Sequence, residues 1–597
     1  MSDRRLELAG LGPALFILFW TLVGLRLGGY PQYVVAISII SMLVGIALVV
    51  LVGLGRCITL ASGSIMAIGA YVSTLAAADL QLSYLATLAL AAAGGGAAGW
   101  LMAFPGTRFR GHNLAMVTLV FQSVSIILIR ESTWLTGGAE GIHVPAPHLF
   151  GLTVAGDRSF LILIGVAAAV MTLIVTLLVR GPFGKNLQAA AGNEIAAEAF
   201  GISVRGYLTA AFVVSSITIA FAGALLAPRV RILDPDSFGV LDSIFMLAYP
   251  IVGGMYSMWG GLIGGGGLRV LPELLRPVAD YEELFFATLV IVVVMFFPGG
   301  LTELTRRALE SIIKQHRSRA FKPIAALSSS PAIPAKTGNC ADELLLVEAI
   351  DKHFDALHAV DGASLRVPVG GIHGLIGPNG AGKTSLFNII SGFLDADSGR
   401  VALAGTSLLE LPARDRIGLG MTRTFQNVAI FGRLSCLENV VIGLGRNAVV
   451  HAMAASFDQF AGGAATHGAK RLALTALESV GLAGQAHSRA GSLSLGDQRR
   501  LEIARAIVCE PRLVLLDEPV SGVAESETED LRELLIRINA ERQIAMLVVE
   551  HNIPFVAKLC RSLSVMGTGR IVAEGEPAEV IALPIVRQLY FGEEAEA

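Results

Sequence analysis

The apolar run YVVAISIISMLVGIALVVLVGL, at residues 33–54, constrains this chain more than any other stretch of its sequence. It carries no charged side chain and is long enough to cross a bilayer, which needs about 20 mostly apolar residues. Further candidate spans lie at about 10–28, 57–78, 84–104, 113–130, 160–179, 207–228, 238–252, 258–272 and 283–299. The upstream half is therefore predicted to be an all-α, polytopic membrane domain.

The predicted number of spans is eight to ten, because the segments at 238–252 and 258–272 are short and glycine-rich and could form one broken span. Lysine and arginine residues gather on alternate connections, starting with Arg4 and Arg5. This bias places both ends of the membrane domain on the cytoplasmic side. Arg229 and Arg231 fall on an outer loop and depart from the pattern.

Ionisable side chains are almost absent from the apolar runs, with Asp242 and Arg26 as exceptions near span ends. Ion-coupled carriers usually need intramembrane carboxylates as relays, so we expect the energy to come from elsewhere. We interpret Asp242 as an interfacial or pore-edge carboxylate, with a substrate contact as the alternative. Small residues such as Gly260 and Gly264 are predicted to let helices pack closely, the alternative being that they line a narrow path.

Residues 316–342 separate the chain into two parts. This segment begins with basic residues, continues with Ala, Ser and Pro, and has no hydrophobic periodicity, which is typical of a flexible linker. We expect a transmembrane permease-like domain at 1–315, the linker at 316–342 and a soluble α/β domain at 343–597. The net charge of −3 says nothing about nucleic acid, but the sequence has no basic stripe with interleaved aromatics, so we expect no nucleic-acid partner. The five scattered cysteines show no metal-ligand spacing.

The downstream part contains GLIGPNGAGKTS at 374–385, which fits the pattern of a phosphate-binding loop. A strand-like stretch precedes it and a helix-like stretch follows, so backbone N–H groups and the helix N-terminus can face the phosphates of ATP. Lys383 is predicted to reach the β- and γ-phosphates, and the Thr384 hydroxyl to ligate Mg²⁺. The predicted ATP-binding residues of this loop are Gly377, Pro378, Asn379, Gly380, Ala381, Gly382, Lys383, Thr384 and Ser385.

A second acidic motif follows in PRLVLLDEP, at 511–519. Its run of Leu and Val is typical of a buried strand in a parallel sheet. Asp517, at the end of this strand, is predicted to hold Mg²⁺ directly or through water. Glu518 is predicted to polarise the water that attacks the γ-phosphate.

Three further motifs surround this pair, and with them residues 344–597 resemble the ATP-binding subunit of an ATP-binding cassette (ABC) transporter. They are RTFQN (423–427), LSLGDQRRLEIARAI (493–507) and VVEHN (548–552). The resemblance implies that Gln426 contacts Mg²⁺ and the attacking water and that His551 contacts the γ-phosphate. It also implies that Phe354, in DKHFD, stacks on the adenine.

The signature motif of this family closes over the phosphate loop of a second ATPase domain, and the resemblance assigns that contact to Ser494 and Gly496. The sequence departs from the usual LSGGQ at Leu495 and Asp497. It also has Ala524 where the family usually carries Asp or Asn, which puts the coupling between two ATP sites in question.

Residues 30–300 resemble the permease subunits of binding-protein-dependent importers for branched-chain amino acids. The resemblance rests on TLASGSIMAIGAY (59–71), RFRGHNLAMVTL (108–119), TGGAEGI (136–142), NEIAAEAFGISV (193–204) and VGGMYSMWGGLIG (252–264). It implies a fused permease and ATPase subunit that drives import of branched-chain amino acids with ATP. Import of urea or short amides is the alternative, followed by an ABC exporter half-transporter or an ATP-gated channel.

The resemblance also implies partners and a location. One chain carries a single phosphate loop and a single signature, so a second permease and a second ATPase subunit are needed, and the family favours homologous subunits over a homodimer. A soluble periplasmic or extracellular binding protein would deliver the solute. The expected location is the bacterial inner membrane, with the ATPase in the cytoplasm.

The inner loop at Glu194–Gly201 is expected to dock on the ATPase. Small and apolar residues recur along it at helical spacing, at Ile195, Ala196, Ala199 and Phe200. A helix outside the bilayer with an apolar face needs a partner, although an ordinary connecting helix is the alternative.

Overall fold

The computed structural model describes residues 2–149, 152–154, 156–274, 282–297, 299–303, 343–355, 357–445, 449–460 and 464–591. The predicted linker at 316–342 lies outside the described residues. The chain divides into two compact units. Unit 1 comprises Met1–Ala191, Arg205–Ser328 and Ala452–Ala461, and unit 2 comprises Gly192–Val204, Ser329–His451 and Gly462–Ala597.

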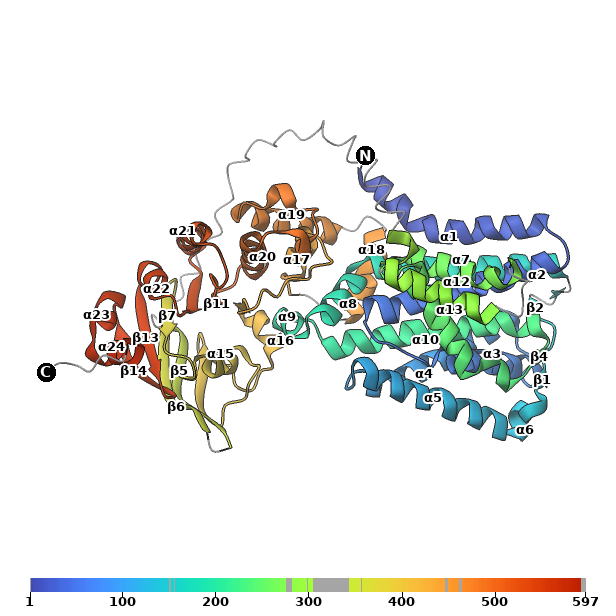
Figure 1. Cartoon of the computed structure of the whole chain (residues 1–597), viewed down its shortest axis with the longest axis horizontal. Helices are drawn as coiled ribbons and strands as arrows, with labels where there is room; N and C mark the ends of the chain where they lie inside the picture. Colours follow the sequence, from blue (N-terminus) through green and yellow to red (C-terminus); the bar gives the residue numbers. More distant parts are fainter. Residues whose placement is uncertain are drawn as a thin grey trace. The chain divides into compact units, whose positions relative to one another are not determined.

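Unit 1 is a bundle of apolar helices (Figure 1). Six helical segments are long and apolar enough to cross a membrane: Tyr30–Leu54, Tyr84–Gly106, Gly111–Glu131, Asp157–Arg180, Val204–Val230 and Pro235–Gly253. Three shorter apolar helices lie at Leu11–Arg26, Ser62–Ala78 and Leu284–Phe296. The elements are α1 (Ser2–Arg26), α2 (Tyr30–Leu48) continued by η1 (Val49–Leu54), α3 (Ser62–Ala78), α4 (Tyr84–Gly106), α5 (Gly111–Glu131), α7 (Asp157–Arg180), α8 (Pro182–Gly192), α10 (Val204–Val230), α11 (Val240–Gly253), α12 (Met258–Leu274) and α13 (Glu282–Phe296).

Glycines allow α12 to lie directly on α2 and α11. A Cβ atom added to Gly45 of α2 would lie 2.2 Å from the carbonyl oxygen of Gly261, and one added to Gly264 would lie 1.8 Å from that of Tyr249. Side chains cannot occupy these positions, so the prediction that glycine serves close helix packing is confirmed. The segments at 238–252 and 258–272 are two separate helices that fold back on each other, not one broken span.

Two arginines at the ends of membrane helices have acidic partners, and one of them, Arg229, departs from the charge bias. Arg229, at the end of α10, forms an ion pair with Asp157 at the start of α7, with 2.5 Å between Nη1 and Oδ1. Arg130, at the end of α5, pairs with Asp236. These pairs do not remove the departure of Arg229 from the charge bias, because acidic residues contribute little to the positive-inside rule.

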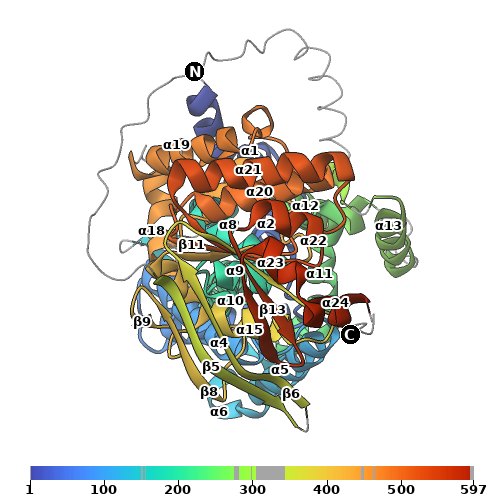
Figure 2. The same cartoon turned by 90° about the vertical axis from the view of Figure 1, so that its left-hand side faces the viewer.

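Unit 2 contains two sheets. A six-stranded sheet has the order β10-β11-β12-β7-β13-β14, in which the neighbours from β10 to β13 are parallel and β14 is antiparallel to β13. A four-stranded antiparallel sheet has the order β6-β5-β8-β9 (Figure 2). The strands are β5 (Glu343–Phe354), β6 (Leu357–Pro368), β7 (Ile372–Ile376), β8 (Ser398–Leu403), β9 (Thr406–Ser407), β10 (Met421–Arg423), β11 (Leu513–Asp517), β12 (Ala545–Val549), β13 (Ser562–Gly567) and β14 (Arg570–Gly575).

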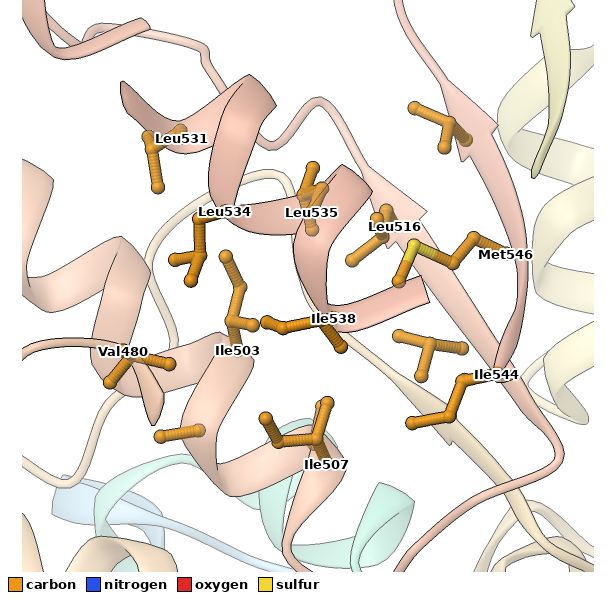
Figure 3. Packing of buried hydrophobic residues seen from close by; sticks show 14 of the residues in the cluster. Val480, Ile503, Ile507, Leu516, Leu531, Leu534, Leu535, Ile538, Ile544 and Met546 are labelled. Carbon is orange, nitrogen blue, oxygen red and sulfur yellow. The ribbon is translucent and has the colours of Figure 1, made fainter. Parts of the chain in front are cut away.

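Helices bury one face of the parallel sheet. Ile503 and Ile507 of α20 (Leu495–Ile507) belong to one hydrophobic cluster with Ile538 of α21 (Glu525–Arg542), Leu516 of β11 and Met546 of β12 (Figure 3). Every residue of β7, β11 and β12 is buried, as expected for central parallel strands covered on both faces. The fold class is confirmed: a helical membrane part is followed by an α/β ATPase part.

Candidate functional site

The phosphate loop connects β7 to α15 (Lys383–Ser391), at the carboxyl end of the parallel sheet. Gly382 has a φ of 97°, and a Cβ atom there would lie 2.1 Å from the carbonyl oxygen of Ala359 in β6. Only glycine fits this position, and its backbone ends the loop at the helix N-terminus. Gly377, Pro378, Asn379, Gly380 and Ala381 form the rest of the loop, while Lys383, Thr384 and Ser385 begin the helix. This arrangement matches a cradle for phosphate groups.

Lys383 lies over the loop that it is predicted to serve. Its Nζ donates to the carbonyl oxygens of Gly377, at 2.6 Å, and Pro378, at 2.9 Å. Burial lowers the pKa of Lys383, and the Glu518 carboxylate acts in the opposite direction. The phosphate loop and the acidic end of β11 therefore share one electrostatic environment, as parallel neighbours of β12 should.

Asp517 is buried at the end of β11 and is bound by a cation that the sequence did not single out. Nη2 of Arg423, in β10, lies 2.8 Å from Oδ2 of Asp517, and only 7% and 8% of the two side chains are exposed. Arg423 also donates to Oδ1 of Asn388, at 2.7 Å, and Oγ of Ser391, at 2.6 Å, both in α15. Burial raises the pKa of Asp517, whereas Arg423 lowers it. Arg423 thus ties the acidic strand to the helix of the phosphate loop.

Glu518 follows Asp517 in an uncommon backbone conformation. Its φ is 44°, a left-handed value that non-glycine residues seldom adopt and that is often found at active sites. Its N–H donates to the carbonyl oxygen of Val549, the last residue of β12, at 2.9 Å. Nδ1 of His551 lies 3.8 Å from Oε2 of Glu518, so the predicted base and the predicted phosphate contact are neighbours.

A buried carboxylate that the sequence analysis missed comes directly after β12. Glu550 is 1% exposed and accepts from the backbone N–H groups of Val520, at 3.2 Å, and His551, at 3.1 Å. It joins the loop after β11 to the loop after β12, and so positions the backbone on either side of Glu518 and His551. The side chain of His551 itself is exposed to solvent.

Gln426 is exposed, and its backbone is fixed by the signature helix. Nη2 of Arg499 in α20 donates to the carbonyl oxygen of Gln426, at 2.5 Å, and Nη1 donates to that of Phe425, at 2.7 Å. Two hydrogen bonds therefore join the loop that carries Gln426 to α20.

Phe354 lies at the end of β5, opposite Leu357 at the start of β6. Its ring is exposed, and Nζ of Lys352 lies 5.7 Å from the ring centroid. The β5–β6 hairpin contacts the phosphate loop through Ala359. An exposed aromatic ring on this hairpin suits the predicted stacking on adenine.

The signature residues make their own contacts with α20 and α21. Ser494 caps α20 by accepting from the backbone N–H of Asp497, at 3.2 Å, and a Cβ atom on Gly496 would lie 2.7 Å from Oε2 of Glu527. Ala524 occupies the N-cap position of α21 and offers no side-chain cap. An Asp or Asn at this position would accept from the helix N-terminus, which typically contributes about 1 kcal/mol.

The predicted docking loop forms a short helix, α9 (Glu194–Ala199), that belongs to unit 2. Ala196, Ala199 and Phe200 are buried, as predicted for an apolar face with a partner, whereas Ile195 is 57% exposed and does not belong to that face. Phe200 covers Arg505 of α20, whose guanidinium carbon lies 4.6 Å from the ring centroid.

Arg505 is an unusually buried cation. Its side chain is 1% exposed, and among the described residues its guanidinium nitrogens have no hydrogen-bond partner. Glu502, at 3.8 Å, and the rings of Phe200 and Phe431 surround it. Burial lowers the pKa of Arg505 to about 10. The docking loop therefore completes the environment of a charge in the signature helix.

A second segment belongs to a different unit from its neighbours in the sequence, and the sequence analysis did not predict it. Most of α18 (Val449–Phe460), from the predicted ATPase domain, belongs to unit 1. Ser456 is buried there, and its Oγ accepts from the backbone N–H of Phe183 in α8, at 3.2 Å. A Cβ atom on Gly181 would lie 2.3 Å from that of Ser456, so glycine permits this contact.

Comparison with known proteins agrees with this geometry. A family model described as "ABC transporter" matches residues 360–521, and one described as "Branched-chain amino acid transport system / permease component" matches residues 30–297. The high-affinity branched-chain amino acid transport ATP-binding protein BraF of Pseudomonas aeruginosa is 35% identical over 250 residues, which cover 42% of this chain and 98% of the relative.

Two relatives from Escherichia coli cover the two parts. The ATP-binding protein LivG is 34% identical over 250 residues, covering 42% of this chain and 98% of the relative. The permease protein LivM is 33% identical over 301 residues, covering 46% of this chain and 71% of the relative.

The phosphate loop, the acidic strand end and the signature helix define an ATPase of the ABC class, coupled to transport. The chain belongs to the ABC transporters, and it joins a permease of the branched-chain amino acid transport family to an ABC ATPase. It is a membrane protein with a cytoplasmic ATPase part, and it combines components that are separate proteins in these relatives.

Proposed function

We propose that this chain drives import of branched-chain amino acids as a fused permease and ATPase subunit. The observation that carries the proposal is that both parts are similar to components of the same kind of transport system. Import of urea or short amides, or export by a half-transporter, has no comparable support.

We assign the boundaries 1–315 to the permease domain, 316–342 to the linker and 343–597 to the ATPase domain. ATP would lie on the phosphate loop, with Phe354 against the adenine and Lys383 at the β- and γ-phosphates. Bound Mg²⁺, held by Thr384, Asp517 and Gln426, would neutralise charge on the phosphates. The glycine-rich loop leaves space for the phosphates of ATP, and the Asp517 carboxylate is a suitable ligand for Mg²⁺.

Hydrolysis requires a base and a group that contacts the γ-phosphate. Glu518 takes the first role, accepting a proton from the attacking water, and His551 takes the second. Their 3.8 Å separation and the constrained backbone of Glu518 support this assignment. Ser494 and Gly496 close over the ATP of a partner ATPase subunit.

Transport requires further subunits. A second permease and a second ATPase, homologous to this chain and not copies of it, complete the pathway in the bacterial inner membrane, and a periplasmic or extracellular binding protein delivers the solute. The α9 loop transmits the motion, because Phe200 packs on Arg505 in the same helix whose Arg499 holds the backbone of Gln426.

Uptake by the assembled complex tests the proposal. Proteoliposomes containing this chain, its partner subunits and a binding protein should accumulate labelled L-leucine with ATP inside and exclude labelled urea. Accumulation of urea without leucine, or equal leucine accumulation without nucleotide, would overturn it.

The variant Glu518→Gln supplies the matched negative control. We expect ATP hydrolysis to fall at least about 100-fold, because general-base catalysis typically contributes about 10²–10⁴-fold. ATP binding should persist, since the amide keeps the size of the side chain. Normal hydrolysis by this variant would remove Glu518 from its assigned role.

A further inference from the structure

The membrane unit contains a partly open pocket whose lining includes residues of α2, α11, α12 and α13. Its volume is about 250 Å³. Ligand pockets for drug-sized molecules usually measure about 300–1,000 Å³, so this space suits a smaller molecule. Most of its lining is apolar, including Ile37 and Ile40 of α2, Phe245 and Met246 of α11, and Phe286 of α13.

Two opposite charges line this apolar space. Asp242 lies in the first turn of α11 and Arg269 lies in α12, within the span that the sequence predicted at 258–272. The sequence analysis noted Asp242 and overlooked Arg269. Ionisable groups in membrane helices are costly and typically mark functional sites.

Asp242 and Arg269 both line the pocket, and among the described residues their side chains do not pair with each other across it. Oδ2 of Asp242 accepts from the backbone N–H of Gly239, at 3.1 Å, which caps α11. Arg269 interacts electrostatically with Asp242, but within the described part of the chain the two side chains form no ion pair with each other. A carboxylate and a guanidinium thus lie on adjacent helices with room between them.

We propose that this space is a solute-binding site for a zwitterionic amino acid with an apolar side chain. Asp242 binds the α-ammonium group, Arg269 binds the α-carboxylate, and the aliphatic and aromatic lining surrounds the side chain. Arginine suits the second role because its planar guanidinium can donate two parallel hydrogen bonds to a carboxylate. The inference rests on the proposed function, and it assigns Asp242 to substrate contact instead of a purely interfacial role.

Direct binding to the full-length chain in lipid nanodiscs tests this site. The probes are L-leucine, isopentylamine, which lacks the carboxylate, and 4-methylpentanoate, which lacks the ammonium group. We expect Arg269→Gln to weaken leucine binding at least about tenfold, as loss of a charged hydrogen bond should, and to leave isopentylamine binding unchanged. Asp242→Asn should weaken leucine binding similarly and leave 4-methylpentanoate binding unchanged.

The pattern across probes separates recognition from a structural role. Asn at position 242 can still accept from Gly239, so the helix cap is retained. Equal loss of all three probes in both variants, or no loss in either, would overturn the proposal. The variants Asp79→Asn and Arg108→Gln, whose side chains lie outside the pocket lining, should bind all probes as the wild type does.

The outcome also distinguishes this proposal from the broader one. If the wild-type chain binds no leucine while the assembled complex imports it, the site is wrong and the transport function stands. If the complex imports no leucine, the transport function itself fails.

Discussion

Arg423 has the largest number of distinct partners around the nucleotide site. It pairs with Asp517, donates to two side chains of α15, and lies 4.7 Å from the ring centroid of Phe387. Replacing it with leucine would leave the Asp517 carboxylate buried without its cation, a loss that typically costs about 3–5 kcal/mol. We therefore expect Arg423→Leu to lower the calorimetric unfolding temperature of the ATPase part by about 6–20 °C.

An exposed ion pair provides the control for this variant. Arg400 lies 3.8 Å from Glu348, and its side chain is 58% exposed. Surface pairs contribute about 0–1 kcal/mol, so Arg400→Leu should change the unfolding temperature by no more than about 3 °C. Equal effects of both replacements would show that Asp517 does not depend on Arg423.

His373 predicts a dependence of stability on pH. It is buried in β7, where its ring nitrogens contact Oγ of Ser562, at 2.7 Å, and Ser564, at 2.9 Å, and burial lowers its pKa from 6.5 to about 4. The unfolded state therefore binds the proton first. Its contribution to stability is present above pH 6.5 and is lost as the pH falls toward 4, by about 3 kcal/mol in total.

Urea unfolding of the wild type and of His373→Asn at several pH values measures this contribution. The difference between the two curves should change between pH 6.5 and 4 and should be flat above that range. His487→Asn, at an exposed position, should retain the wild-type profile. A flat difference throughout would show that His373 titrates alike in both states.

For single residues, the sequence predicted the members of the site that lie in contiguous motifs. The phosphate loop and the acidic strand end are contiguous motifs, so their residues could be named from spacing alone. The roles of Arg423 and Arg269 could not be named in this way, because Arg423 meets Asn388 and Asp517 only after folding. Arg269 was overlooked within a predicted span, and it shares a pocket with Asp242 only because two helices pack together. The chemical roles assigned to the residues of the site remain predictions.

Helix α9 is the element that we propose to couple ATP hydrolysis to transport. Phe200 is fully buried against Arg505, and a buried cation–π contact contributes about 2 kcal/mol. We expect Phe200→Ala to lower leucine uptake per ATP hydrolysed by at least about fivefold, which is the lower range of typical coupling energies. ATP hydrolysis by the variant complex should continue.

The neighbouring Ile195 offers a matched control on the same helix. It is 57% exposed, so Ile195→Ala removes a similar apolar side chain without disturbing Arg505. Uptake and hydrolysis measured together in proteoliposomes should keep their wild-type ratio in this variant. If Ile195→Ala lost coupling and Phe200→Ala did not, our assignment of the docking face to Phe200 would be wrong.

Elements were predicted well where apolar length or periodicity decides them. The ten candidate spans each correspond to a helix, because twenty or so apolar residues have few other options in lipid. The separation of α11 from α12 was not predictable from length. It depends on contacts between Gly253 and Gly260 and between Tyr249 and Gly264, which pair residues across a tight reversal.

At the scale of the whole chain, the linker is expected to tether and not to shape the nucleotide site. We predict that deleting residues 320–340 leaves the ATP affinity within about twofold of the wild type, since distant changes rarely alter local free energies by more than about 0.5 kcal/mol. Equilibrium binding of a fluorescent ATP analogue measures this. Loss of nucleotide binding would mean that the ATPase domain begins before residue 343.

The two-part organisation was visible in the sequence because apolar spans and a phosphate loop require different solvents. The docking of residues 194–201 was also predicted, whereas the membership of residues 452–461 in unit 1 was not, since the composition of that stretch does not distinguish it from its neighbours in the sequence. Their assignment comes from packing, at Phe200 against Arg505 and at Ser456 against Phe183.

Unit 1 includes residues 452–461 and unit 2 includes residues 192–204, which has a consequence for dividing the chain into two polypeptides. If the coding sequence were cut between positions 328 and 329, each product would lack a stretch that its own compact body includes. Each polypeptide would then rely on the other to supply that stretch. A single polypeptide supplies both parts together and in equal number.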